Sequence, residues 1–363
     1  MTGDLPDVFE VHSDGEDFVY GAAGIVEDLR GQIPASWNNR FNAAVRQSGT
    51  VTQDKYDQSL PGTSTSHGAR RGGEGMTHVL VTGAAGHIGR LVVDDLLSHG
   101  HRVTATDRNP VHDPRLTRSL AGDLRDRELV REALRGVEAL VHLAAIPHPD
   151  TRDPAGQFTA NCHTAFLALD EAGRAGVRRV VAASSIGALG LAWSTHPRSP
   201  GHVPVDESHP TLAEDPYGLS KLVLEQVAEG THRRWGTDTI CLRFPFTGTG
   251  PRLTRQLAAV RADPGHHASD LWGWLDTRDA ATAIRAALAA EAHGSHVLYV
   301  AAPDTSSDIP TAELLARYHP TADIVAPLSR FAGLYDTSRC TRLLGFTPAH
   351  RRRTTDAVTE GPR

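Results

Sequence analysis

The sequence predicts an α/β fold built on a doubly wound parallel sheet, and two observations lead to this prediction. An apolar run at 78–81 leads through a glycine-rich turn at 82–89 into apolar residues at helical spacing, which stop at Gly100. Strand and helix patterns then alternate along the chain. Such alternation places helices on both faces of a parallel sheet. A small C-terminal substrate-binding portion is expected to follow the sheet.

The alternating pattern also sets the expected domain boundaries. Strands are predicted near 102–106, 137–143, 178–184 and 238–243, and helices near 155–175 and 216–235. Residues 76–245 are therefore expected to form a nucleotide-binding domain of the Rossmann type, 246–350 a substrate-binding portion and 351–363 a tail. Residues 1–75 show neither alternating strands nor a long apolar stripe. We expect them to be a poorly ordered N-terminal extension.

The glycine-rich turn has glycines where a dinucleotide site needs them. Gly83, Gly86 and Gly89 allow a tight turn, close approach of the backbone to a pyrophosphate, and close packing of helix on strand. The helix N-terminus adds backbone amides and a positive dipole. Asp107 ends the next strand, where a carboxylate binds a ribose hydroxyl and repels a ribose phosphate, so NAD is favoured over NADP. Arg108 weakens this preference, because an arginine can accept the phosphate.

Tyr217 and Lys221 give the strongest indication of chemistry. Asp215 can cap a helix that begins at Pro216, and the four-residue spacing then puts phenol and ammonium on one face. A nearby cation favours the phenolate of a tyrosine, whose ordinary pKa is near ~10. The chain has two lysines, Lys55 and Lys221, and is rich in arginine, so a compact ammonium is indicated here. A bare pair of this spacing would otherwise be a surface contact on a helix.

These motifs resemble the extended short-chain dehydrogenase/reductases, also called the NAD-dependent epimerase/dehydratase family, from about Met76 to about Pro348. The run 122–126 resembles the family's adenine-binding loop, and the run 142–145 resembles its strand end beside the cofactor. The resemblance implies a set of cofactor-binding residues: Gly83, Ala85, Gly86, His87, Ile88, Gly89, Asp107, Arg108, Asp123, Leu124, Leu143, Ala144, Ala145, Tyr217 and Lys221.

The resemblance also implies a catalytic mechanism. The run 180–185 resembles the strand that carries the catalytic hydroxyl, and counting back from Gly190 selects Ser185 for that role. Tyr217 is expected to take a proton from a substrate hydroxyl while hydride leaves the same carbon for the cofactor. Ser185 would hold the substrate oxygen, and Lys221 would bind the nicotinamide ribose. Asn161 is expected either to position Lys221 or a water, or to tie two strands together.

Substrate identity is less well determined by the sequence. Ile186 and Gly187 follow Ser185 where family dehydratases carry an Asp-Glu pair, so 4,6-dehydration is not expected. The short C-terminal part and the motif at 217–221 are similar to uronate dehydrogenases and other small-sugar dehydrogenases, although those have an asparagine at the place of Ile186. Arg243 could grip a carboxylate or diphosphate, or form an ion pair at the strand end.

The expected function is therefore NAD(P)-dependent hydride transfer at a hydroxyl or ketone carbon of a sugar-like or secondary-metabolite substrate, with Ser185, Tyr217 and Arg243 as substrate contacts. Two alternatives stay open. One is a nucleotide-sugar epimerase, and the other is a cofactor-sensing regulator without catalytic activity.

Composition argues against several other classes of protein. The formal net charge of −6 offers no basic surface to nucleic acid, and no run approaches the ~18 apolar residues of a membrane span. Three widely spaced cysteines argue against a disulfide framework and favour a reducing, cytoplasmic location. The twenty histidines, including the pair at 266–267, show no metal-ligand spacing, so no metal is expected. A small-molecule substrate is the expected partner, and a homodimer is compatible with the sequence.

Overall fold

The computed structural model describes residues 76–149 and 152–353. These residues belong to the unit Gly72–Arg363. The expectations for the N-terminal extension, 1–75, and for most of the tail, 354–363, lie outside the described residues.

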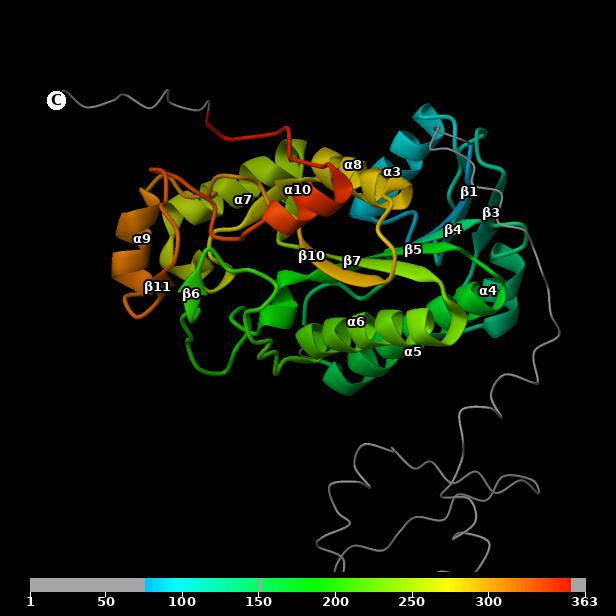
Figure 1. The fold of residues 1–363 in the computed structure, drawn as a ribbon, viewed down its shortest axis with the longest axis horizontal. Helices are drawn as coiled ribbons and strands as arrows, with labels where there is room; N and C mark the ends of the chain where they lie inside the picture. The colour runs from blue at the N-terminus through cyan, green and yellow to red at the C-terminus, as the bar shows by residue number, and fades with distance from the viewer. Residues whose placement is uncertain (1–75, 150–151, 354–363) are drawn as a thin grey trace, which may run out of the picture. The chain divides into compact units, whose positions relative to one another are not determined.

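A seven-stranded parallel sheet forms the centre of the fold (Figure 1), in the order β10-β7-β5-β4-β1-β2-β3. Its strands are β1 (His78–Thr82), β2 (Arg102–Asp107), β3 (Arg118–Ala121), β4 (Ala139–His142), β5 (Arg179–Ser185), β7 (Asp238–Phe244) and β10 (Ser295–Tyr299). The direction of winding reverses between β1 and β4. Doubly wound sheets bind their ligands outside the carboxyl ends of the strands at such a point. The fold class predicted from the sequence is confirmed.

Helices cover both faces of this sheet (Figure 1). One face carries α3 (His87–Ser98), α8 (Thr277–Ala289) and α10 (Ser338–Leu344), and the other carries α4 (Arg127–Ala133), α5 (Pro154–Arg174) and α6 (Pro216–Trp235). Val79 and Val81 of β1 pack under the first group of helices, whereas Leu80 packs under the second. Burial on both faces explains why the strand reads as a continuous apolar run.

The remaining elements lie outside the large sheet and its helices, and most of them belong to the C-terminal part of the chain. They are β6 (His202–Val203) paired with β11 (Asp323–Ile324), β8 (Phe246–Gly248) paired with β9 (Trp274–Asp276), α7 (Gly250–Ala262), α9 (Thr311–Tyr318), and the 3₁₀ turns η2 (Ile186–Leu189) and η3 (Gly265–Asp270). Their own core is built around Leu271, Trp272, Leu314 and Leu334. β10 lies in the range assigned from the sequence to the substrate-binding portion, yet it completes the large sheet. No helix within 76–149 and 152–353 is long and apolar enough to cross a membrane.

Candidate active site

A cavity of about 790 Å³ opens at the carboxyl ends of the central strands. Gly83 follows β1, Leu143 follows β4, and Ser185 and Phe244 end β5 and β7, and all four line it. The opposite wall comes from β8, α7 and η3 of the C-terminal part. The cavity therefore lies where the strand order predicts a ligand site, between the sheet and the elements β8, α7 and η3.

The glycine turn closes one end of this cavity without room for side chains. Gly83 has φ +69°, and a Cβ built there would lie 2.7 Å from the amide nitrogen of Ala144. A Cβ on Gly89 would lie 2.1 Å from the Gly83 carbonyl oxygen, so α3 packs directly on the turn. No side chain caps α3 at Gly86. The first amides of α3 are thus left for a ligand, and these residues fit the pyrophosphate of a dinucleotide.

Asp107 is fixed beside the glycine turn. One carboxylate oxygen accepts a 3.1 Å hydrogen bond from the amide of Ala85, and the other accepts one of 3.0 Å from the amide of Asn109. Arg108 follows it and is exposed. Hydrogen bonds from Arg125 hold the pKa of Asp123 down at about 2, with a smaller contribution from Arg108. Charged groups of both signs therefore gather at this edge of the sheet.

The cavity wall contains only part of the expected cofactor set. Gly83, Gly86, His87, Ile88, Gly89, Leu143, Ala145, Tyr217 and Lys221 line it. The other expected residues lie outside its wall: Ala85, Asp107, Arg108, Asp123, Leu124 and Ala144.

Tyr217 and Ser185 meet at the cavity wall. The Asp215 carboxylate caps α6 by accepting hydrogen bonds from the amides of Tyr217 (3.0 Å) and Gly218 (2.8 Å), which fixes the first turn. Both residues line the cavity, and the Trp193 ring meets the Tyr217 ring edge-on at 5.7 Å. Burial raises the pKa of Tyr217 to about 12, although the nearby Ser185 hydroxyl acts to lower it. With this pKa, the tyrosine is a protonated phenol at neutral pH when no cofactor is bound.

Lys221 lies one turn further along α6. Its Nζ donates a 2.8 Å hydrogen bond to the carbonyl oxygen of Ala183 and is 5.5 Å from the centre of the Tyr217 ring. Burial lowers the pKa of Lys221 to about 8. An ammonium has three N–H donors, and within the described residues Nζ has this single hydrogen-bond partner, so donors remain for a ligand.

Asn161 ties α5 to neighbouring segments. Its carbonyl oxygen accepts a hydrogen bond from the Ile146 amide (2.8 Å), and its Nδ2 donates to the Ile146 carbonyl (3.2 Å) and to Ser220 Oγ (3.1 Å). Asn161 therefore holds the segment after β4 against α6, next to Lys221 in sequence. Of the roles expected for Asn161, these contacts favour the structural one, except that Asn161 joins a loop to a helix rather than two strands.

Arg243 does not reach this cavity, and its expected substrate role is corrected. It is buried and donates hydrogen bonds to both carboxylate oxygens of Glu225 (2.8 Å each) and to the Tyr299 hydroxyl (3.1 Å). The cavity that it lines is a different one, shared with Glu207 and Arg339. The Arg243 guanidinium is paired with Glu225 and is absent from the wall of the active-site cavity, so the ion-pair alternative describes it.

The C-terminal wall contains polar residues that the sequence did not single out as substrate contacts. Arg252 donates through Nε to the Thr247 carbonyl (2.9 Å) and lies over the Phe246 ring. It forms no ion pair with any acidic side chain of the described residues. Burial lowers the pKa of His87, and the positive charge of Arg252, on the wall of the same cavity, acts in the same direction. Gln256, His266, His267, Ser269 and Asp270 complete this wall.

Within 76–149 and 152–353, no group of three or more His, Cys, Asp or Glu side chains is arranged to hold a metal ion.

Residues 79–301 match the model of the NAD dependent epimerase/dehydratase family. The chain belongs to this family. It is an enzyme of the extended short-chain dehydrogenase/reductase type, the class of NAD(P)-dependent oxidoreductases and epimerases. The family and the enzyme class expected from the sequence are thus confirmed.

Two curated relatives show how broad this family is. The chain is 36% identical over 165 residues to Sterol demethylase protein B of Methylococcus capsulatus, which is 41% of this chain and 50% of that protein. It is 31% identical over 276 residues to cinnamoyl-CoA reductase 1 of Arabidopsis thaliana, 69% of this chain and 74% of that protein. The chain therefore spans half the length of the first relative and about three quarters of the second.

Solved structures share the fold. A short-chain dehydrogenase/reductase superfamily protein from Agrobacterium tumefaciens with bound NAD is 26% identical, with a TM-score of 0.58 over 76% of this chain and 93% of that chain. Uronate dehydrogenase from the same organism is 22% identical, with a TM-score of 0.56 over 76% of this chain and 85% of that chain. The likeness to uronate dehydrogenase shows the fold alone.

Proposed function

We propose that this enzyme moves a hydride between NAD and a hydroxyl or ketone carbon of a sugar-like or secondary-metabolite substrate, with Tyr217 as the acid and base. The observation that carries the proposal is that Ser185, Tyr217 and Lys221 line one cavity, with Lys221 Nζ 5.5 Å from the centre of the Tyr217 ring. NAD on the glycine turn would supply the site that accepts or releases the hydride.

Each side chain has a distinct part in this mechanism. Ser185 and Tyr217 hold the substrate oxygen between two hydroxyl groups. In the direction of reduction, the protonated phenol of Tyr217 donates its proton to the carbonyl oxygen. In the direction of oxidation, Tyr217 must first lose its own proton, and the Lys221 ammonium favours this because a nearby positive charge lowers the pKa of a phenol. Free donors on Lys221 would also hold the nicotinamide ribose.

NAD is the cofactor that we propose in preference to NADP. The Asp107 carboxylate is fixed beside the glycine turn, where it would accept hydrogen bonds from ribose hydroxyls and repel a phosphate. Arg108 would favour NADP, but its side chain is exposed, whereas the Asp107 carboxylate is held by two backbone amides.

A nucleotide-sugar epimerase is the second candidate. Arg252, exposed at the cavity wall and without a carboxylate partner among the described residues, could bind a phosphate group. The name of one group of relatives, UDP-glucose 4-epimerase, agrees with such a substrate. Membership of an enzyme family, with Ser185, Tyr217 and Lys221 on one cavity wall, argues against a regulator without catalysis.

A substrate screen tests the proposal. Uronates, free sugars, UDP-sugars and simple secondary alcohols are incubated with NAD or NADP, and reduced nicotinamide is followed by its absorbance. Net formation of reduced cofactor with a sugar-like compound supports a dehydrogenase. Interconversion of two UDP-sugars without net reduction supports the epimerase instead. If no compound of any class gives either product, the hydride-transfer proposal is contradicted.

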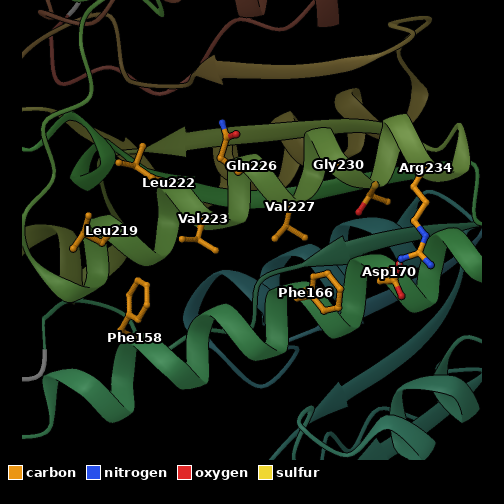
Figure 2. A pocket seen from close by; sticks show the side chains of 11 residues that line it. Phe158, Phe166, Asp170, Leu219, Leu222, Val223, Gln226, Val227, Gly230 and Arg234 are labelled. Atoms are coloured by element: carbon orange, nitrogen blue, oxygen red, sulfur yellow. The ribbon is translucent and has the colours of Figure 1, made fainter. Parts of the chain in front are cut away.

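We further propose that two copies of the chain pair through α5 and α6. A groove of about 570 Å³ lies between these helices, and Figure 2 shows Phe158, Phe166, Val223 and Val227 along it. The Phe166 side chain is 49% exposed, and burial against the same face of a second copy would remove it from water. Sedimentation should give a dimer for the wild type and a monomer for Phe166→Glu, while Ile324→Glu, an exposed apolar residue on β11, stays dimeric. A monomeric wild type contradicts pairing.

The location that we propose is the cytoplasm. Cys162, Cys241 and Cys340 are all unpaired, and two of them are buried. Burial raises the pKa of the Cys241 thiol, which keeps it unreactive. Free thiols of this kind are typical of a reducing compartment. Fractionation of cells that produce the protein tests this location, and recovery outside the cytoplasm contradicts it.

A further inference from the structure

His267 and Asp270 form a hydrogen-bonded pair in the C-terminal wall of the active-site cavity, on elements that the Ser185, Tyr217 and Lys221 site does not use. His267 Nδ1 lies 3.4 Å from Asp270 Oδ2, and both residues line the cavity. The two side chains are 12% and 23% exposed. They are therefore mostly withdrawn from water, yet they open on the space where a substrate would lie.

The backbone directly after the pair is strained. Leu271 has φ 53° and Trp272 has φ 51°, and both are fully buried residues other than glycine. Two successive residues in the left-handed region are energetically costly, and such strain persists only where the surroundings impose it. Strain of this kind is concentrated at ligand sites, which favours a role in ligand binding for the neighbouring His267 and Asp270.

Several contacts impose this conformation. The Trp272 indole donates to the Pro264 carbonyl (2.8 Å), and the Tyr335 hydroxyl donates to the Asp270 carbonyl (3.1 Å). The Trp272 amide donates to Asp270 Oδ1 (3.1 Å), which fixes the carboxylate. Because Trp272 and Tyr335 belong to the core of the C-terminal part, that core holds Asp270 in place.

The fixed carboxylate determines the state of the imidazole. Burial raises the pKa of Asp270, while the hydrogen bonds with His267 and the Trp272 amide favour its ionised form. An ionised carboxylate only accepts hydrogen bonds, so with Asp270 ionised the proton of a neutral His267 lies on Nδ1, toward Asp270. The Gln256 amide also lies 3.4 Å from Nδ1, but the charged oxygen is the stronger partner. Nε2 is then left with a lone pair. Nε2 has no hydrogen-bond partner among the described residues, and it is not fully buried. Because His267 lines the cavity, a molecule there can reach Nε2.

We propose that His267 Nε2 accepts a hydrogen bond from a second hydroxyl of the substrate, away from the carbon at Tyr217, with Asp270 as the positioning residue. This inference rests on the proposed function and narrows its substrate to a polyhydroxylated compound. Other parts of the wall, such as Ile186, Pro245 and Phe246, are apolar and accept any hydrocarbon surface. A substrate without the second hydroxyl would leave Nε2 without a hydrogen-bond partner, and its affinity would be lower.

The test compares two kinds of probe and two variants. D-galacturonate, D-glucose and UDP-glucose represent polyhydroxylated compounds, and cyclohexanol represents a ring with one hydroxyl group. Binding to the NAD-saturated protein is titrated, and kcat and KM are measured wherever turnover occurs. We expect His267→Ala and Asp270→Asn to raise Kd or KM about tenfold for the polyhydroxylated probe that binds the wild type, with kcat changed far less. Cyclohexanol should be unaffected. His293→Ala is the matched control, because His293 is 87% exposed on the loop before β10.

A spectroscopic signature separates positioning from general damage. In Asp270→Asn, the new amide can donate to Nδ1, so the proton of the imidazole should move to Nε2. Nitrogen chemical shifts of the imidazole in labelled protein report this change directly. An unchanged tautomer in this variant contradicts the positioning role of Asp270.

The outcomes also distinguish this inference from the proposed function. If polyhydroxylated probes bind, and bind more weakly to His267→Ala, but are never oxidised, the hydride-transfer proposal fails and this one stands. If only cyclohexanol and similar alcohols are bound or oxidised, or if His267→Ala leaves Kd and KM for the sugar probes unchanged, this inference is overturned.

Discussion

Glu225 of α6 accepts a 2.6 Å hydrogen bond from the hydroxyl of Ser184 on β5. Ser184 precedes Ser185, and Glu225 lies one helical turn beyond Lys221, so this contact joins the strand that carries Ser185 to the helix that carries Tyr217. The same carboxylate accepts two hydrogen bonds from Arg243 of β7. The alignment of the catalytic hydroxyl groups therefore depends on a buried ion pair outside the cavity.

Neutralising this carboxylate should destabilise the fold. Glu225→Gln leaves the Arg243 guanidinium buried without a counter-charge, and breaking such a pair typically costs ~3–5 kcal/mol of unfolding free energy. Urea denaturation measures the loss. Glu229→Gln, one turn further along α6, removes an exposed partner of Arg233 and should cost less than ~0.5 kcal/mol. Equal stability of Glu225→Gln and wild type would show that the pair contributes nothing.

Cofactor choice should depend on Asp107. We expect wild-type protein to bind NAD more tightly than NADP. The difference between the two affinities should be smaller in Asp107→Ala, because this variant has no carboxylate to repel a ribose phosphate. Some NAD affinity should also be lost, since the Ala85 amide loses its acceptor. Titration with both cofactors measures this, with Asp323→Ala on β11 as an exposed control. Wild-type protein that prefers NADP would show that Arg108 decides the site.

The buried ammonium of Lys221 should lower the stability of the folded protein. Burial lowers its pKa from 10.5 to about 8, so between these values the unfolded chain binds more protons than the folded protein. Stability therefore rises with pH in this window, and below pH 8 the full penalty of about 3 kcal/mol applies. Loss of the hydrogen bond to Ala183 offsets part of the gain when the charge is removed.

Lys221→Met should accordingly be up to about 3 kcal/mol more stable than wild type near pH 7, with little difference near pH 10.5. Turnover should be lost in the same variant. Urea denaturation at the two pH values checks the first expectation. A variant that is less stable at neutral pH, or whose advantage does not change with pH, contradicts the pKa of Lys221.

Local sequence patterns were sufficient for the central part of the fold. The run from β1 through the glycine turn into α3 is encoded by neighbouring residues, and so is the cap at Asp215. The two edge strands, β3 and β10, were not predicted. β3 has four residues whose exposure alternates, and β10 is only partly buried at its start, so neither carries the continuous apolar run of a central strand.

The candidate site was predictable only where its residues lie in local motifs. Tyr217 and Lys221 are four residues apart on one helix, whereas His267 and Asp270 reach the cavity because Trp272 and Tyr335 pack in a separate core. Arg243 was misassigned because its partners, Glu225 and Tyr299, come from distant segments. Long-range packing of this kind leaves no short-range pattern in the sequence.

The most direct test of the central claim is turnover by Tyr217→Phe, which removes the hydroxyl and keeps the ring. With the substrate found by the screen, kcat should fall by ~10²–10⁴-fold, the usual effect of losing a general acid or base, while NAD affinity changes little. Ser185→Ala should cost less, because it removes a positioning hydrogen bond. If Tyr217→Phe turns over at the wild-type rate, Tyr217 is not the acid and base, and the mechanism proposed for this enzyme is wrong.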